Sequence, residues 1–309
     1  MPGIFGLFDF TKPGKGVEKD APSKARFLIF LEIFFRKFWN LIKINFMFFL
    51  FNIPAFIIGF FISYLIMPQG LIPLENQLVT AEYAAIGEVY FRFIIGLIFC
   101  VIPIVTVGPF QCGFTYILRN YAKEEHAFIW GDFKEHAKNN RKQALAVSII
   151  DLILLCIILF ALSFYYTQDS SVASFIFGIV CVGLVIFFMM HIFIYPMLVT
   201  FHVTLKQLYT NCFKFALFKF LPNTVILIIC GLVTLLPFII PVYGYVIGSI
   251  LLILITLSFT GLLTNFYAYP LLKKYMIDKR QDINNHNHEE ALLTDDSKDG
   301  ESSFIDSDK

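Results

Sequence analysis

Charged residues are scarce in this chain of 309 residues, where Asp, Glu, Lys and Arg together make up only 15%. Soluble globular domains carry about a quarter of such residues. Hydrophobic residues reach 58%, and 38 residues are phenylalanine, which is more apolar surface than a soluble domain of this size presents. This composition excludes an ordinary soluble protein and predicts an integral membrane protein in contact with the lipid bilayer.

Cysteine pairs with the spacing of a metal site are absent. The six cysteines stand alone in the sequence and form no C-x-x-C pattern: Cys100, Cys112, Cys156, Cys181, Cys212 and Cys230. Structural zinc sites bring cysteines in closely spaced pairs, and disulfide frameworks are typical of small secreted domains. We therefore expect free thiols, no disulfide framework and no bound metal.

The motifs of the common enzyme classes are missing as well. The chain contains no P-loop, no H-E-x-x-H, no G-x-S-x-G and no kinase signature. Its first 25 residues are polar and interrupted by Gly and Pro, unlike a cleavable signal peptide. We expect a protein that is not an enzyme, with no cofactor, no catalytic residues and no nucleic-acid partner.

Long apolar runs dominate the rest of the chain. About 20 apolar residues are needed to cross a bilayer as a helix. By this criterion the sequence predicts six transmembrane helices, at about 44–66, 91–118, 144–166, 172–200, 223–241 and 245–269. The predicted fold class is an all-α polytopic membrane protein.

The basic residues predict the orientation of these helices. Lys and Arg accumulate in cytoplasmic loops of membrane proteins. Of the 24 basic residues, 23 lie in the two terminal segments and in the second-to-third and fourth-to-fifth connections, whereas Arg92 begins the second span. The opposite connections carry acids only: Glu75, Glu82, Glu88 and Asp169. We therefore expect both termini in the cytoplasm and the protein in the plasma membrane.

The chain divides into three regions by composition. Residues 1–26 form a cytoplasmic N-terminal segment, and residues 27–280 form the membrane domain. Residues 281–309 combine many acids with few apolar residues, which predicts a disordered acidic cytoplasmic tail.

Aromatic and basic segments precede each outward-going span, at 27–43, 127–143 and 211–223. Their pattern predicts interfacial amphipathic helices on the cytoplasmic side. Each segment is followed by a span out and a span back, and each return span carries a proline: Pro109, Pro196 and Pro270. Two interpretations stay open. In the first, the membrane domain consists of three related hairpins. In the second, such inner loops are a general feature of any six-span protein.

The stretch "PIVTVGP" interrupts the second span at Pro103, Thr106, Gly108 and Pro109. Proline removes a backbone donor and bends a helix, and the Thr106 hydroxyl is placed to satisfy a freed carbonyl. Gly108 permits close approach of another backbone. We expect a bent, closely packed helix here; a hinge, or the wall of a substrate path, is the functional alternative.

Ionisable residues inside spans are functional candidates by default. Asp151 lies in the third span and His191 in the fourth, at similar distances from the inner boundary. They form a candidate intramembrane polar pair that would couple proton movement to transport. The structural alternative is a polar clamp between helices, or a protonated aspartate satisfied by Ser148 or a backbone carbonyl.

Three longer stretches carry a family resemblance. The stretches are the opening "GLFDFTKPGKGVEKD", the long segment "IPIVTVGPFQCGFTYILRNYAKEEHAFIWGDFKEHAKNNRKQALAVSIIDLIL" and the later segment "IFIYPMLVTFHVTLKQLYTNCFKFAL". They resemble the YesL-like family of bacterial membrane proteins, a domain of unknown function. Arg141 departs from the family pattern, in which an aromatic residue is common. The resemblance implies a cell-membrane protein linked to carbohydrate uptake, because such proteins are often encoded beside carbohydrate ABC importers, but it supplies no catalytic residue.

Two functions follow as expectations. The first is an accessory or regulatory partner of an ABC-type carbohydrate importer, acting beside importer subunits or as a homo-oligomer. Its candidate docking loop, "EHAFIWGDF", contains Glu125, Trp130, Gly131 and Phe133 and faintly resembles the loop by which ABC permeases dock their ATPase. The second is a transporter or permease subunit for a small solute, proton-coupled through Asp151 and His191.

Overall fold

The structure, a computed structural model, describes residues 25–66, 85–89, 92–93, 108–239 and 244–278. Within these ranges it is helical. The helices are α1 (Arg26–Phe51), α2 (Ile53–Ile66), α4 (Gly108–Ala122), α5 (Ile129–Asn139), α6 (Arg141–Tyr166), α7 (Ser171–Leu198), α8 (Leu205–Phe218), α9 (Phe220–Ile239), α10 (Gly244–Leu251) and α11 (Leu257–Leu272), with π-helical stretches η2 (Leu252–Thr256) and η3 (Lys273–Asp278).

Four long apolar helices in the described part could cross a membrane: Arg141–Tyr166, Ser171–Leu198, Phe220–Phe238 and Val246–Asp278. They coincide with the last four predicted spans and indicate a multi-pass membrane protein. The first predicted span falls on the end of α1 and on α2, and most of the second lies outside the described residues. The six-span arrangement and the cytoplasmic location of the termini stay predictions.

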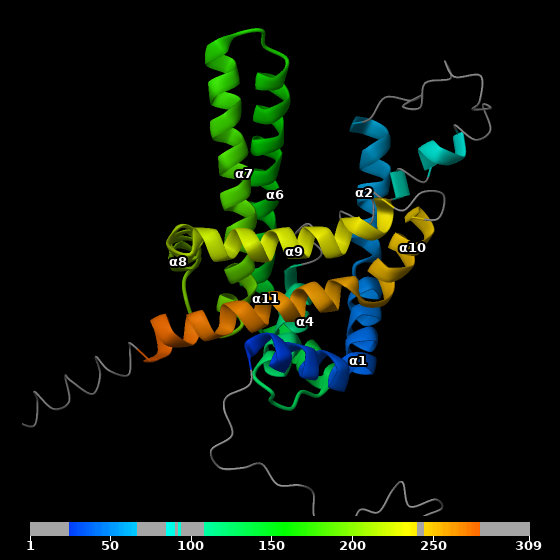
Figure 1. The fold of residues 1–309 in the computed structure, drawn as a ribbon, viewed down its shortest axis with the longest axis vertical. Coiled ribbons are helices and arrows are strands. Elements are labelled where there is room, and N and C mark those ends of the chain that lie inside the picture. The colour runs from blue at the N-terminus through cyan, green and yellow to red at the C-terminus, as the bar shows by residue number, and fades with distance from the viewer. Residues whose placement is uncertain (1–24, 67–84, 90–91, 94–107, 240–243, 279–309) are drawn as a thin grey trace, which may run out of the picture.

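Figure 1 shows how the long helices are arranged. Helices α6 and α7 form a hairpin that stands upright, whereas α9 and α11 run across it in this view. The short helix α8 begins with a capping box. The Thr204 hydroxyl accepts from the backbone N–H of Gln207, and the Gln207 amide oxygen accepts from the backbone N–H of Thr204.

Helix α4 is the central packing element, and most of its side chains are buried. It contacts α1, α5, α6, α7 and α11. Near its end, Arg119 donates to the carbonyl of Val199 and to the hydroxyl of Thr200, both at 2.9 Å. The arginine therefore ties α4 to the carbonyls that α7 leaves unpaired at its C-terminus.

Two glycines let other helices approach α4 very closely. A Cβ atom on Gly108 would lie 2.4 Å from the backbone oxygen of Ala144 in α6, and one on Gly113 would lie 2.5 Å from the backbone oxygen of Phe133 in α5. Neither distance leaves room for a methyl group. Gly108 thus lies close against α6, and Gly113 lies close against α5 in the same way.

Asn45 of α1 explains why the last long helix becomes π-helical at η2. Its amide nitrogen donates to the carbonyls of Leu252 at 2.9 Å and Ile253 at 2.6 Å, and its oxygen accepts from the N–H of Ser258 at 2.7 Å. A side chain inserted into the backbone ladder leaves room for one extra residue per turn. Asn223 links α8 to α11 in a similar way, because it donates to Phe215 and accepts from Tyr267.

The contacts follow a pattern that is compatible with three related units. Helix α5 packs on α4, α8 packs on α7, and α1 packs on η2 and α11, while α4, α7 and α11 contact one another. Pro196 and Pro270 each lie two residues before the last residue of α7 and α11, whereas Pro109 lies thirteen residues before the last residue of α4.

We predict that Gly113→Ala lowers the melting temperature of the full chain in mild detergent. The added methyl must displace the backbone of α5, and overpacking of this kind costs about 1–3 kcal/mol. Gly178→Ala in α7 is the matched control, because nothing lies within 4 Å of its added Cβ. A melting temperature for Gly113→Ala that matches wild type would contradict the packing described.

Candidate functional site

Asp151 is completely buried in α6, among helices that are apolar enough to cross a membrane. It lies ten residues after Arg141, or about 15 Å along the helix at 1.5 Å per residue. Each carboxyl oxygen has one side-chain partner. His191 of α7 contacts Oδ2 at 3.0 Å, and Tyr209 of α8 donates to Oδ1 at 2.7 Å. The predicted Asp151–His191 pair is therefore formed in the structure, with a third member.

The second ring nitrogen of His191 determines its tautomer. Nδ1 lies 3.0 Å from the backbone carbonyl of Phe187, one turn earlier in α7. A carbonyl oxygen only accepts, so Nδ1 carries a hydrogen, and this assignment rests on the hydrogen-bond geometry. The nitrogen that faces Asp151 is Nε2.

Tyr209 was not predicted from the sequence. It lies beside the buried stripe of α8, which contains Leu208, Cys212 and Phe215. A tyrosine on a buried stripe needs a partner for its hydroxyl, and this signal points to a polar group on the facing helix. Burial raises the pKa of the Tyr209 phenol, and the neighbouring Asp151 raises it further, so the hydroxyl stays protonated.

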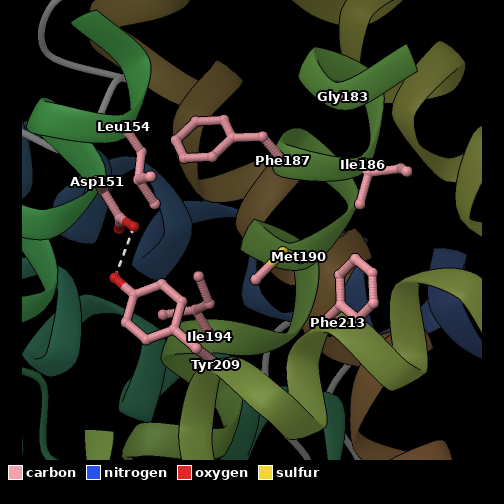
Figure 2. Close-up of a pocket in the computed structure, with 9 residues that line it drawn as sticks. All are labelled: Asp151, Leu154, Gly183, Ile186, Phe187, Met190, Ile194, Tyr209 and Phe213. Carbon is pink, nitrogen blue, oxygen red and sulfur yellow. Dashed lines mark hydrogen bonds between the residues drawn. The ribbon is translucent and has the colours of Figure 1, made fainter. Parts of the chain in front are cut away.

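An apolar pocket of about 240 Å³ adjoins this cluster. Figure 2 shows the hydrogen bond between Asp151 and Tyr209 at one side and the side chains of Phe187, Met190 and Phe213 around the rest. The wall is contributed by α6, α7 and α8. Among the lining residues, Asp151 and Tyr209 alone carry polar side-chain groups, so the pocket suits a largely apolar group with a polar group at one side.

Other predicted polar residues lie elsewhere. The Ser148 hydroxyl contacts the Tyr195 hydroxyl at 3.4 Å, so its partner is Tyr195. His202 follows α7 and its side chain is exposed. Among the described residues, no group of three His, Cys, Asp or Glu side chains is placed to hold a metal ion.

The "PIVTVGP" stretch is described only in part. Gly108 and Pro109 form the start of α4, and Gly108 packs against α6 as described above. Pro103 and Thr106 lie outside the described residues. The bend expected in the second span therefore stays a prediction.

The candidate docking loop contains exposed and buried residues. Trp130 and Gly131 are exposed at the start of α5, and the Glu125 carboxylate pairs with Lys123 at 2.6 Å. Phe133 is buried and stacks on Phe51, with ring centroids 5.4 Å apart. Phe133 thus supports the loop from inside, while Trp130 is exposed and stacks on Phe51, with ring centroids 6.0 Å apart.

We predict that Asp151→Ala destabilises the protein and that Asp151→Asn does so much less. Alanine leaves His191 Nε2 without its partner and leaves Tyr209 only the longer hydrogen bond to the Val147 carbonyl, at a cost of about 1–3 kcal/mol. The asparagine amide accepts from Tyr209 and donates to an unprotonated Nε2. Thermal unfolding of both variants in detergent measures the difference. Equal melting temperatures for Asp151→Ala and wild type would contradict the described network.

Comparison with known proteins gives one match. Residues 41–162 match the model of a family described as a protein of unknown function, DUF624. The matched segment includes Asp151 and the docking loop but ends before His191 and Tyr209. No curated protein and no solved structure matches the chain. The protein therefore contains a region similar to DUF624, a domain of unknown function, within a multi-pass helical membrane protein.

Proposed function

We propose that the protein is a plasma-membrane protein, with both termini in the cytoplasm, that acts as an accessory or regulatory partner of an ABC-type carbohydrate uptake system. In this role it catalyses no reaction. The resemblance to the YesL-like family supports the link to carbohydrate uptake. The role as a partner is supported mainly by the structure of α5. This short helix lies between α4 and α6 in the chain and packs firmly on α4.

Helix α5 combines a rigid base with an exposed aromatic tip. Its base is the contact between Phe133 and Gly113, reinforced by rings of Phe51 and Phe110. At its tip, Phe128 is 70% exposed and Trp130 is 60% exposed. Exposed aromatic residues on a rigid element are the usual anchors of protein interfaces. The predicted orientation places this tip on the cytoplasmic side, where the ATPase of an importer is found.

We predict that the full chain, purified from its native membrane in mild detergent, brings an ABC permease or its ATPase in stoichiometric amounts. The double variant Phe128→Ala/Trp130→Ala is expected to reduce this recovery at least tenfold, since interface anchors contribute about 2 kcal/mol or more. Quantitative mass spectrometry of the purified material measures the recovery.

Trp39→Ala is the matched control for this experiment. Trp39 of α1 is 74% exposed but lies outside the α5 tip, so its removal tests whether any exposed aromatic residue has the same effect. Recovery of the protein alone, or equal recovery from the double variant and wild type, would contradict the proposed docking.

A second function is favoured by the contact between Asp151 and His191 inside two candidate spans. In this function the protein is a transporter or permease subunit that couples solute movement to protons. Proteoliposomes with an imposed pH gradient are then expected to take up sugar, and Asp151→Asn is expected to lose the gradient-driven part. Uptake that is equal in both proteins would exclude a coupling role for Asp151.

A further inference from the structure

We propose that Asp151, His191 and Tyr209 form a site for two protons. One proton is shared between Asp151 and His191, and a second binds to Asp151 when the Tyr209 hydroxyl turns toward the carbonyl of Val147. The inference shares its residues with the second function above and extends it to Tyr209. It concerns proton binding alone and does not require that any solute moves.

The shared proton follows from the orientation of His191. Nδ1 donates to the carbonyl of Phe187, and Nε2 faces Asp151 Oδ2 at 3.0 Å. With no proton between them, two lone pairs would meet at hydrogen-bond distance. One proton on Nε2 forms the bond, as imidazolium with carboxylate, and Oδ1 remains to accept from Tyr209. The pair is then neutral overall, which suits a site among membrane helices.

Tyr209 provides the place for the second proton. Its oxygen lies 2.7 Å from Asp151 Oδ1 and 3.3 Å from the backbone carbonyl of Val147. A tyrosine hydroxyl has one hydrogen, so it donates to only one of these acceptors at a time. In the one-proton state the hydrogen points to the nearer oxygen, Oδ1.

Protonation of Oδ1 reverses this hydrogen bond. The new O–H of Asp151 donates to the Tyr209 oxygen, and Tyr209 donates in turn to the second lone pair of the Val147 carbonyl. The imidazolium of His191 continues to donate to Oδ2. Every donor retains an acceptor in this state, and the network gains one proton and one positive charge without breaking a covalent bond.

Other titratable side chains surround the pair. Tyr195 of α7 and Cys212 of α8 are the other titratable groups that act on Tyr209, and Cys112 acts on Tyr195. Burial, and then the charge of Asp151, raise the pKa of the Cys212 thiol, which keeps it neutral. The basic residues Lys206 and Lys214 of α8 have exposed side chains. The side chains of His191 and Tyr209 are both partly exposed.

Infrared difference spectroscopy of the full chain in lipid nanodiscs tests the proposal. Acidification from mildly alkaline pH is expected to produce a carboxylic-acid band that is lost in Asp151→Asn, together with a change in a tyrosine ring band. The tyrosine change is expected to be lost in Tyr209→Phe. Tyr195→Phe is the matched control and should retain it, since Tyr195 contacts Ser148 and not Asp151.

Two results would overturn the proposal. One is a carboxylic-acid band that is absent, or that persists in Asp151→Asn. The other is a tyrosine change that persists in Tyr209→Phe. If Asp151→Asn does not fold, wild type labelled with ¹³C in the aspartate carboxyl group, compared with Tyr209→Phe, decides the same question. A protein that shows both bands but transports no sugar contradicts the transport function and leaves this site intact.

Discussion

A buried carboxyl group needs a partner for each oxygen, and in this protein that need joins three helices. Asp151 of α6 is fully buried, and its partners come from α7 and α8. An apolar residue at this position would impose no particular geometry, whereas the hydrogen bond from Tyr209 orients α8 against α6 and the contact with His191 joins α6 to α7. The apolar pocket beside the cluster exists because α8 is held at this place.

Helix α6 connects this cluster to the proposed docking helix. Helix α5 ends at Asn139 and α6 begins at Arg141, so a displacement of one shifts the other. Both are fixed to α4, through Gly113 and Gly108, where a backbone approaches too closely for any side chain. Helix α6 therefore connects the Asp151 cluster to α5 in the chain, and it is the element that the two proposed functions share.

The sequence predicted the four long apolar helices well, because a run of about twenty apolar residues is typical of a helix that crosses a membrane. It also predicted the Asp151–His191 contact, since two isolated polar residues at equal depth in neighbouring spans have few other partners. Tyr209 was missed because α8 reads as an interfacial helix, and nothing in its local pattern shows that it turns back onto α6. The π-helical stretch at η2 was also missed, since its cause, Asn45, lies 207 residues away. The sequence placed a proline in each return span, and the structure shows Pro196 and Pro270 near the C-terminal ends of α7 and α11, whereas Pro109 lies farther from the end of α4.

The tautomer of His191 tests the account most directly, because the shared proton depends on it. Nitrogen-15 NMR of histidine-labelled protein in lipid, with His191→Gln used to assign the signal, reports the protonation of both ring nitrogens. The account predicts that Nδ1 carries a hydrogen and that Nε2 is hydrogen-bonded to Asp151, with a signal that changes in Asp151→Asn. An unprotonated Nδ1, or a His191 signal that does not respond to Asp151→Asn, would contradict it.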